Sequence, residues 1–133
     1  MKNSNFKLSL RFRHPKIAPD FVESSIQMQS LHKWKSGEPI TTPKGKKLDG
    51  IRNENYCCFR ISTDGEDIIE ALNKLNKILV KKVLFIDDYI TSGGTIEYYL
   101  SVYCEDGGFS EEFDNKLLAD IARNKINFGL EIL

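Results

Sequence analysis

The sequence predicts one α+β domain, built on a four-stranded, largely antiparallel sheet with helices on one of its faces. A chain of 133 residues suits a single hydrophobic core. Four segments carry apolar residues at every second position, as half-buried strands do, and others carry them at helical spacing. These segments alternate along residues 1–133 in the order β-α-β-α-β-α-β, which we expect to fold as a single domain.

The first strand and the first helix are predicted from the N-terminal quarter of the chain. Apolar and polar side chains alternate over residues 6–12, the period of a half-buried strand. Pro19 suits the first turn of a helix, which we expect to include residues 19–26. Residues 29–55 are rich in glycine, proline and lysine, and they predict a long connection in which Trp34 is the one large apolar anchor.

The middle of the chain predicts a second strand followed by a long helix. Residues 56–61 form this strand, with Cys57 on its buried face. Thr63 and Glu66 match the spacing of a capping box, which predicts the start of a helix. Apolar residues then repeat at helical spacing from 68 to 79, so this helix is strongly indicated.

The last third of the chain completes the predicted sheet. We expect residues 83–90 to continue the helical layer and residues 91–94 to turn into a third strand, which alternates over 95–103. Asp114 is positioned to cap a further helix, and residues 126–132 alternate again as a fourth strand. Two strand-helix-strand units joined by a helix indicate a sandwich similar to ferredoxin-like folds.

Composition and charge exclude several classes of protein. Lys+Arg and Asp+Glu both number 19, so no overall charge attracts nucleic acid or an anionic membrane. Three cysteines, two of them adjacent at Cys57 and Cys58, do not suit a secreted disulfide framework. No apolar run approaches the roughly 20 residues of a membrane-spanning helix, and the N-terminus lacks a signal-peptide core. We expect a cytoplasmic protein with no membrane or nucleic-acid partner.

Charge is strongly segregated along the chain. Residues 1–63 hold 12 Lys+Arg and 5 Asp+Glu, whereas residues 64–133 hold 7 and 14. Residues 83–115 contain eight acids and no Lys or Arg, which predicts a local negative field. One interpretation is an ordinary solvated face, and the other is a docking patch for a basic protein. The predicted partner-binding residues are Asp87, Asp88, Tyr99, Tyr103, Glu105, Asp106, Glu111, Glu112 and Asp114.

Catalytic and metal chemistry is weakly represented in the sequence. His14 and His32 are the only candidates for a base at neutral pH, and neither lies in a nucleophile motif. Adjacent cysteines on a strand point to opposite faces, and no zinc-ligand spacing occurs. We expect no catalytic residue, metal site or cofactor.

A cluster of lysines surrounds Trp34. The lysines are Lys33, Lys35, Lys44, Lys46 and Lys47. This composition is compatible with nucleic-acid contact, because lysines pair with phosphates and an aromatic ring stacks on a base. The alternative, which we favour, is that Trp34 packs the connection onto the sheet edge while the lysines remain in water.

Residues 83–95 carry a competing enzyme motif. Their sequence, VLFIDDYITSGGT, resembles the diphosphate-sugar signature of phosphoribosyltransferases. The resemblance implies that Asp87 and Asp88 would hold the ribose hydroxyls and that residues 91–95 would hold the 5-phosphate. The surrounding sequence argues against this function, because the segment follows a helix directly and precedes a strand-like alternation. That family needs a helix there, whose N-terminus favours the phosphate.

A second resemblance covers nearly the whole chain. It rests on LSLRF, PDFVESSI, the Trp-x-x-Gly-Glu element at Trp34, YCCFRI, the long helix, the turn at Gly107, LLADIA and FGLEI, in that order. In these features the chain resembles a bacterial family of small proteins known as domain of unknown function 4279. The resemblance implies an α+β fold without a known activity, and a toxin-neutralising role.

These observations together predict a non-catalytic protein-binding domain. The hypothesis is an immunity protein that neutralises a bacterial toxin, such as a nuclease, by binding it through an acidic surface. The alternatives are a phosphoribosyl-diphosphate-binding enzyme and a small-molecule-sensing module.

Overall fold

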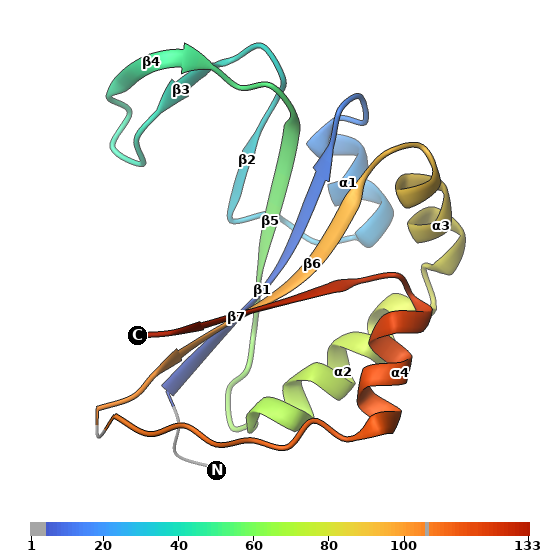
Figure 1. The fold of residues 1–133 in the computed structure, drawn as a ribbon. Coiled ribbons are helices and arrows are strands. Elements are labelled where there is room, and N and C mark those ends of the chain that lie inside the picture. Colours follow the sequence, from blue (N-terminus) through green and yellow to red (C-terminus); the bar gives the residue numbers. More distant parts are fainter. Residues whose placement is uncertain (1–4, 106) are drawn as a thin grey trace.

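The first strand, β1 (Asn5–His14), is the centre of a five-stranded sheet (Figure 1). The computed structural model describes residues 5–105 and 107–133. β1 pairs antiparallel with β5 (Asn55–Ile61) on one side and with β6 (Thr95–Tyr103) on the other. Alternation of apolar and polar residues explains β1 and β6, whose apolar side chains lie mainly on one buried face, whereas β5 is buried on both faces.

Two further strands form the edges of this sheet. β2 (His32–Trp34) pairs antiparallel with β5, and β7 (Asn127–Ile132) pairs in parallel with β6. The spatial order is therefore β2-β5-β1-β6-β7. A separate hairpin, β3 (Pro39–Thr41) and β4 (Lys47–Ile51), extends beyond the β2 end of the sheet (Figure 1).

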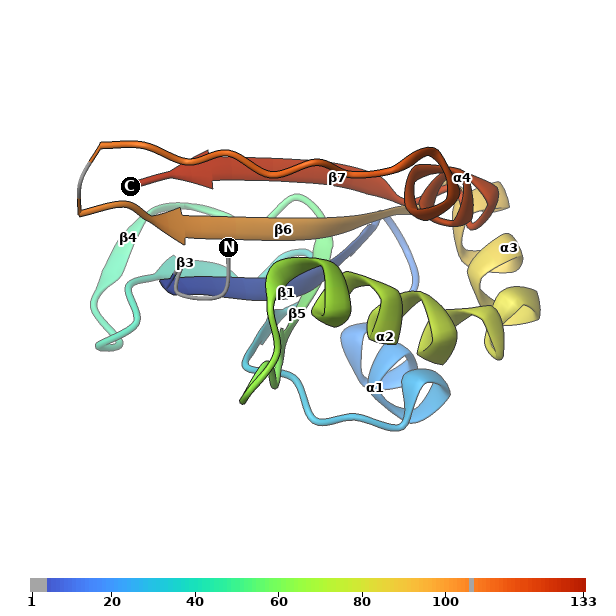
Figure 2. The ribbon, with the colours of Figure 1, turned by 90° about the horizontal axis from the view of Figure 1, so that it is seen from below.

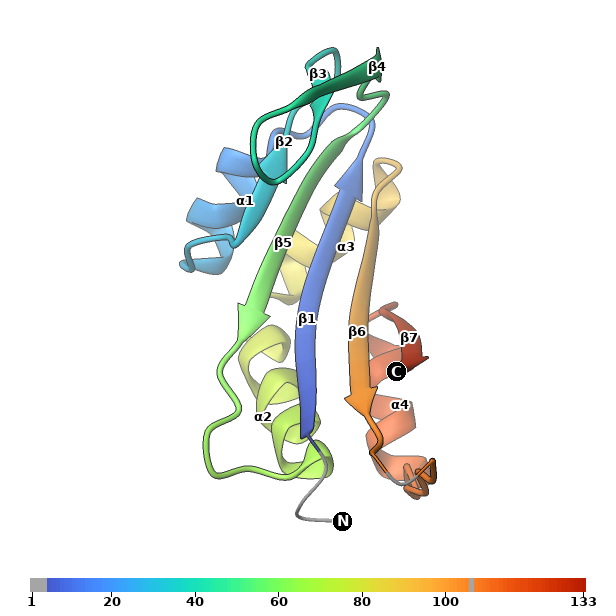
Figure 3. The same cartoon turned by 90° about the vertical axis from the view of Figure 1, so that its left-hand side faces the viewer.

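The described helices cover one face of the sheet and leave the other open. They are α1 (Pro19–Ile26), α2 (Ile68–Val80), α3 (Val83–Thr91) and α4 (Asn115–Arg123). Figure 3 looks onto the open face, with these helices behind the strands. The β6–α4 connection returns beside β7, as Figure 2 shows, where the rings of Phe113 and Phe128 lie 5.4 Å apart.

The core fills the space between the sheet and the helices. Leu10 and Phe12 of β1 are fully buried, as are Leu72 and Leu75 of α2. Tyr89 of α3 packs edge-on against Phe12, with ring centroids 5.4 Å apart. Full burial stabilises each large apolar side chain by about 1.5–3 kcal/mol relative to exposure. This packing holds the sheet rigid, and so fixes the positions of the side chains on its open face.

The structure corrects the predicted strand count and the predicted element order, which is β1-α1-β2-β3-β4-β5-α2-α3-β6-α4-β7. The main sheet has five strands rather than four, and the predicted connection at residues 29–55 contains β2, β3 and β4. These strands have three to five residues each, too short to produce a clear alternation. The parallel pairing of β6 with β7 also differs from a ferredoxin-like sheet, which is antiparallel throughout.

The start of α2 also differs from the prediction. Asp67, not Thr63, is the N-cap, and its carboxylate accepts a hydrogen bond from the backbone N–H of Glu70 at 2.9 Å. Glu70 accepts in return from the Asp67 N–H at 3.1 Å, which completes the capping box. Gly65 has a φ of 73°, a left-handed conformation that keeps residues 63–66 in a turn before the helix begins.

The remaining predicted elements agree with the structure. α1 begins at Pro19, Asp114 caps α4 by accepting from the Leu117 N–H at 2.9 Å, and residues 92–94 turn α3 into β6. Across residues 5–105 and 107–133, no helix is both long and apolar enough to cross a membrane.

Candidate functional site

The open face of the sheet combines arginines with aromatic rings. Lys7, Ser9, Arg11 and Arg13 alternate with the buried apolar residues of β1, so their side chains lie on the face away from the helices. In the register of the sheet, Arg13 of β1 lies opposite Tyr56 of β5, and Arg11 of β1 lies opposite Glu97 of β6. Cross-strand neighbours of this kind interact directly.

Four side chains stack on one another at the β2 edge of this face. The Trp34 and Tyr56 rings are stacked at 4.2 Å with an interplanar angle of 21°. The guanidinium of Arg52 lies 3.7 Å from the Trp34 ring centroid, and that of Arg13 lies 5.0 Å from the Tyr56 ring centroid. Such cation–π contacts contribute about 0.5–1 kcal/mol each at partly exposed sites. We call these four residues the arginine–aromatic stack.

A second aromatic contact lies across β1 from this stack. The Arg11 guanidinium lies 3.7 Å from the centroid of the Tyr99 ring. The ring rests over Gly129 of β7, where an added Cβ would lie only 2.8 Å from it. Partial burial, followed by the carboxylate of Glu131, raises the pKa of Tyr99 above its ordinary value, so its hydroxyl stays protonated at neutral pH.

The charges of the open face are only partly balanced within it. Arg11 Nη1 lies 3.5 Å from Glu97, and Arg13 lies 3.5 Å from Glu54 and 3.9 Å from Glu97. Five cations therefore share this face and its rim with three carboxylates: Lys7, Arg11, Arg13, Arg52 and Arg60 against Glu54, Glu97 and Glu131.

Two of these arginines also keep an unpaired donor. The buried Nε groups of Arg11 and Arg52 find no acceptor among the residues that the structure describes. Buried donors in folded proteins are nearly always paired, so these two are exceptions to the usual pattern.

A groove of about 440 Å³ lies beside the stack, between β2 and the β3–β4 hairpin. Its volume falls within the range of small-ligand and peptide sites. Its walls are basic and hydroxylated, and include His32, Lys33, Trp34, Thr41, Thr42 and Arg52. The groove and the arginine–aromatic stack share Trp34 and Arg52, so they form one continuous candidate surface.

The predicted acidic patch is divided in the structure. Asp87 and Asp88 lie on α3, which precedes β6, whereas Glu105 lies two residues beyond the end of β6. Nine residues of strand separate the two groups by about 30 Å at ~3.3 Å per residue. Glu111, Glu112 and Asp114 belong to the connection before α4 and to its cap, and Asp106 lies outside the described residues.

The two predicted tyrosines lie apart from most of these acids. Tyr99 and Tyr103 share the open face of β6, where Arg11 covers Tyr99 and the Lys7 ammonium lies 5.5 Å from the Tyr103 ring. Asp87 and Asp88 belong to a helix behind the sheet (Figure 3). The tyrosines are thus bordered by cations, by Glu97 and by Glu131, and not by Asp87 and Asp88.

Of the four residues in the stack, only Trp34 is a candidate from the sequence alone, and Arg13, Arg52 and Tyr56 are not. The arginines at every second position of β1 were a usable signal, because a strand with one buried face must present them together on the other. Arg52 had no such signal, since it precedes β5 in an irregular segment and reaches Trp34 only in the folded chain.

The two histidines lie in different environments. His14 is 1 % exposed, and its Nδ1 accepts hydrogen bonds from the backbone N–H groups of Lys16 and Ile17, both at 2.9 Å. Its Nε2 therefore carries the proton and donates to Ser92 at 2.8 Å, which leaves no free lone pair for a base. His32 lies on the groove wall.

The cysteines and acids do not assemble a metal site in the described part of the chain, where no group of three or more His, Cys, Asp or Glu residues could hold an ion. Cys57 and Cys58 are buried free thiols, and Cys104 is half-buried. Burial raises the pKa of Cys57 to about 12, so this thiol is protonated and unreactive at neutral pH.

The phosphoribosyltransferase-like segment has the reverse order of elements from that family. Residues Val83–Thr91 form α3, and the Ser92–Gly94 turn leads into β6. A phosphate at this turn would meet the C-terminus of a helix, whose dipole disfavours an anion. Ser92 donates to the backbone carbonyl of Asp88 at 2.7 Å and bonds with His14, so the turn has structural partners.

Comparison with known proteins adds no relative to this description. No family model matches the chain, and no curated protein matches it. The resemblance to the uncharacterised bacterial family therefore stays a prediction.

Proposed function

We propose that this chain is a non-catalytic protein-binding domain that holds an acidic segment of its partner against the open face of the sheet. The observation that carries the proposal is the arginine–aromatic stack of Arg52, Trp34, Tyr56 and Arg13 beside the groove. Tryptophan, tyrosine and arginine are the residue types that dominate the binding energy of protein interfaces.

The charge of this surface supports an acidic partner. Cations outnumber carboxylates on the face, whereas Lys33 of the groove already forms ion pairs with Asp20 and Glu23. The side chains of Arg11 and Arg13 are 26% and 37% exposed, and carboxylates are strong acceptors for guanidinium groups. An acidic segment would therefore bind the exposed parts of these guanidinium groups.

A protein is favoured over single-stranded nucleic acid because the rings are already covered. A base binds by stacking on a free aromatic face. Here Tyr56 and Arg52 both contact the Trp34 ring, and Arg11 lies over Tyr99. Carboxylate side chains need no free ring face, since they bind the guanidinium edges.

A more specific proposal is the toxin-neutralising role that the family resemblance implies. It requires a protein partner, as the proposal above does, but it names a bacterial toxin. The acidic surface for this role is the connection with Glu105, Glu111 and Glu112, because Asp87 and Asp88 lie at the other end of β6. The two proposals therefore place the partner on different parts of the molecule.

Trp34 provides a direct test of the main proposal. It is the one tryptophan of the chain and lies at the centre of the candidate surface, so its fluorescence reports on occupation of the groove. We expect a short peptide rich in Asp and Glu to change Trp34 emission saturably. Arg52→Gln and Arg13→Gln should each weaken this binding by roughly tenfold, about 1.4 kcal/mol.

Lys81→Gln is the matched control, because Lys81 is an exposed cation at the end of α2, in the helix layer. It should bind the peptide as the unaltered protein does. Preferential binding of a lysine-rich peptide or of a single-stranded oligonucleotide would contradict the proposal. Equal affinity of the Arg52 variant and the unaltered protein would also contradict it.

The toxin-neutralising role is tested by co-expression with genes that neighbour this one. Protection from a toxic neighbour should be lost in a Glu105→Lys/Glu112→Lys variant and kept in Arg52→Gln. Asp114 is left unchanged because it caps α4, and its loss would disturb the helix. If protection depends on Arg52 instead, the result would mean that the toxin binds the open face of the sheet.

A further inference from the structure

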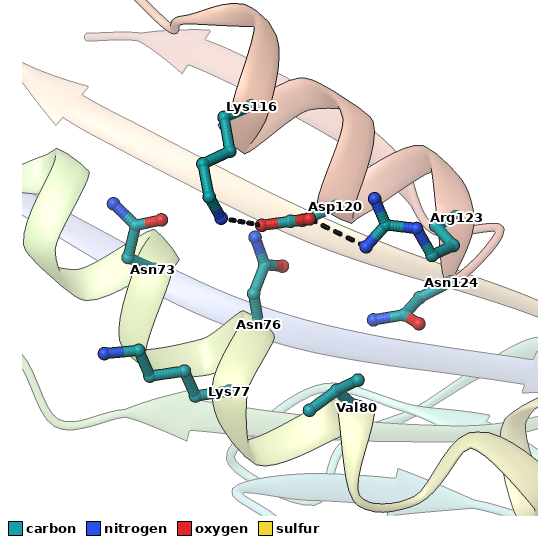
Figure 4. A pocket seen from close by; sticks show the side chains of 8 residues that line it. All are labelled: Asn73, Asn76, Lys77, Val80, Lys116, Asp120, Arg123 and Asn124. Atoms are coloured by element: carbon teal, nitrogen blue, oxygen red, sulfur yellow. Dashed lines mark hydrogen bonds and ion pairs between the residues drawn. The ribbon is translucent and has the colours of Figure 1, made fainter.

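A smaller cavity lies in the helix layer, between α2 and α4 (Figure 4). Its volume is about 150 Å³, room for about five water molecules at ~30 Å³ each. α2 supplies Asn76, Lys77 and Val80 to its wall, and α4 supplies Lys116 and Asp120. The cavity is separate from the open face and from the groove beside Trp34.

The side chain of Asn76 is the main evidence that this cavity binds a ligand. Its side chain is buried, with the residue only 6 % exposed, and its Oδ1 accepts a hydrogen bond from the Tyr98 hydroxyl at 2.7 Å. Its Nδ2 has no acceptor among the described residues. Figure 4 shows this nitrogen directed toward the side of the cavity where Lys116 and Asp120 lie. A buried amide donor without an acceptor is uncommon in folded proteins.

The charges around the cavity favour an anion. Three cations, those of Lys77, Lys116 and Arg123, line the cavity together with a single carboxylate, that of Asp120. Asp120 accepts from Lys116 Nζ at 3.1 Å and from Arg123 Nη1 at 2.8 Å. These two contacts hold the pKa of Asp120 below its ordinary value. The carboxylate thus stays ionised and turned toward its own partners, and positive charge remains in excess.

We propose that this cavity binds a small oxyanion, a carboxylate or phosphate group, which accepts a hydrogen bond from Asn76 Nδ2 and is neutralised by Lys77, Lys116 and Arg123. The volume admits only a few non-hydrogen atoms. A cationic ligand is disfavoured by the three surrounding cations. A neutral ligand leaves their charge unbalanced.

The side-chain amide of Asn76 is the reporter for the test. Inorganic phosphate and malonate are titrated separately into ¹⁵N-labelled protein, with sodium chloride at matched ionic strength as the control. We expect at least one of the two anions to shift the Asn76 side-chain amide resonances saturably, whereas chloride does not. The anion that saturates the shift at the lower concentration identifies the preferred group, phosphate or carboxylate.

Variants separate binding at the cavity from a general salt effect. Asn76→Asp keeps an acceptor for the Tyr98 hydroxyl but places a negative charge where the donor was, so affinity should fall at least about tenfold. Lys77→Gln alters only an exposed side chain at the rim and should weaken binding severalfold, which keeps the test valid if the first variant fails to fold. For these two variants, whose own Asn76 signal is lost or altered, the shift of melting temperature with each anion gives the affinity.

Lys81→Gln is again the control, since it removes a cation of α2 that does not line the cavity. It should bind the anion as the unaltered protein does. The proposal is overturned if neither anion gives a saturable shift, or if Lys77→Gln and Asn76→Asp bind with unchanged affinity.

Discussion

The Nε2 atom of His14 lies 2.8 Å from the hydroxyl of Ser92 and joins the end of β1 to the turn before β6. The ring also packs against Tyr89, with centroids 4.8 Å apart. Two backbone N–H groups, those of Lys16 and Ile17, occupy its Nδ1. The turn that resembles a phosphate-binding loop in sequence is thus a structural joint in which each polar group of the imidazole has a partner.

This joint predicts a pH dependence of stability. Burial, and to a smaller extent the charge of Lys16, lowers the pKa of His14 below 6.5 in the folded state. The unfolded chain then binds more protons than the folded chain at mildly acidic pH. The free energy of unfolding should therefore be constant above about pH 7 and fall as the pH decreases below about 6.5.

Urea denaturation between pH 5 and pH 8 checks this expectation. In His14→Asn, whose carbonyl can accept from the same backbone N–H groups, the decline in this window should disappear. Glu23, whose pKa is lowered to about 2 mainly by its hydrogen bond with Lys33, loses its contribution only between about pH 4.5 and pH 2, so it does not interfere. Equal slopes for the two proteins would assign the decline to another group.

Gly94 is predicted to be irreplaceable at the same joint. A Cβ there would lie 2.5 Å from the Tyr89 ring and 2.7 Å from the His14 ring, both of which are buried. Gly94→Ala should therefore destabilise the protein by about 1–3 kcal/mol, the usual cost of overpacking. Gly108→Ala is the matched control, because a Cβ there meets no atom within 4 Å, and it should change stability by less than about 0.5 kcal/mol. Similar midpoints of urea denaturation for the two variants would disprove this account of the joint.

The sequence predicts the elements that repeat their apolar pattern over many residues. It does not predict those that depend on pairing with a neighbouring strand. Ten residues of β1 and thirteen of α2 repeat their pattern often enough to be recognised. The three residues of β2 are a strand only because β5 lies beside them. The acid-rich stretch is visible as composition, but its division is not, since its two groups of acids lie at opposite ends of β6.

The site was predicted in the same uneven way. Tyr99 and Tyr103 were expected on a polar face of β6, and they are there. Their neighbours come from β1 and β7, strands distant in sequence, so the cations that border them required the sheet order. Trp34 was expected to pack on the sheet edge, and it does so on Tyr56, but the contribution of Arg52 depends on contacts that no local pattern reveals.

The N-terminus of α2 allows a test of which residue, Asp67 or Thr63, caps the helix. Asp67→Ala removes the acceptor for the Glu70 N–H, and should cost about 1 kcal/mol of stability. Thr63→Ala changes a residue that matched the same type of pattern but precedes the helix, and should cost less than about 0.5 kcal/mol. Chemical denaturation of both variants decides between the two. A larger effect at Thr63 would place the functional cap there.

Gly129 controls the position of Tyr99 on the open face. An added Cβ would lie 2.8 Å from the Tyr99 ring and 2.9 Å from the Glu97 carboxylate. Both are outer parts of side chains that are only half-buried, so they can move away. We therefore expect Gly129→Ala to shift the ring away from β7 and to disturb its contact with Arg11, with a smaller loss of stability than Gly94→Ala.

Proton NMR detects this displacement directly. The Arg11 guanidinium lies 3.7 Å from the Tyr99 ring centroid, so the ring current should shift its side-chain protons upfield in the unaltered protein. In Gly129→Ala these resonances should return toward the values of a free arginine, and the acidic peptide should bind more weakly because Arg11 has lost its support. Gly108→Ala should leave both the resonances and the affinity unchanged. Arg11 shifts that are identical in all three proteins would mean that Tyr99 is held by contacts other than the one with Gly129.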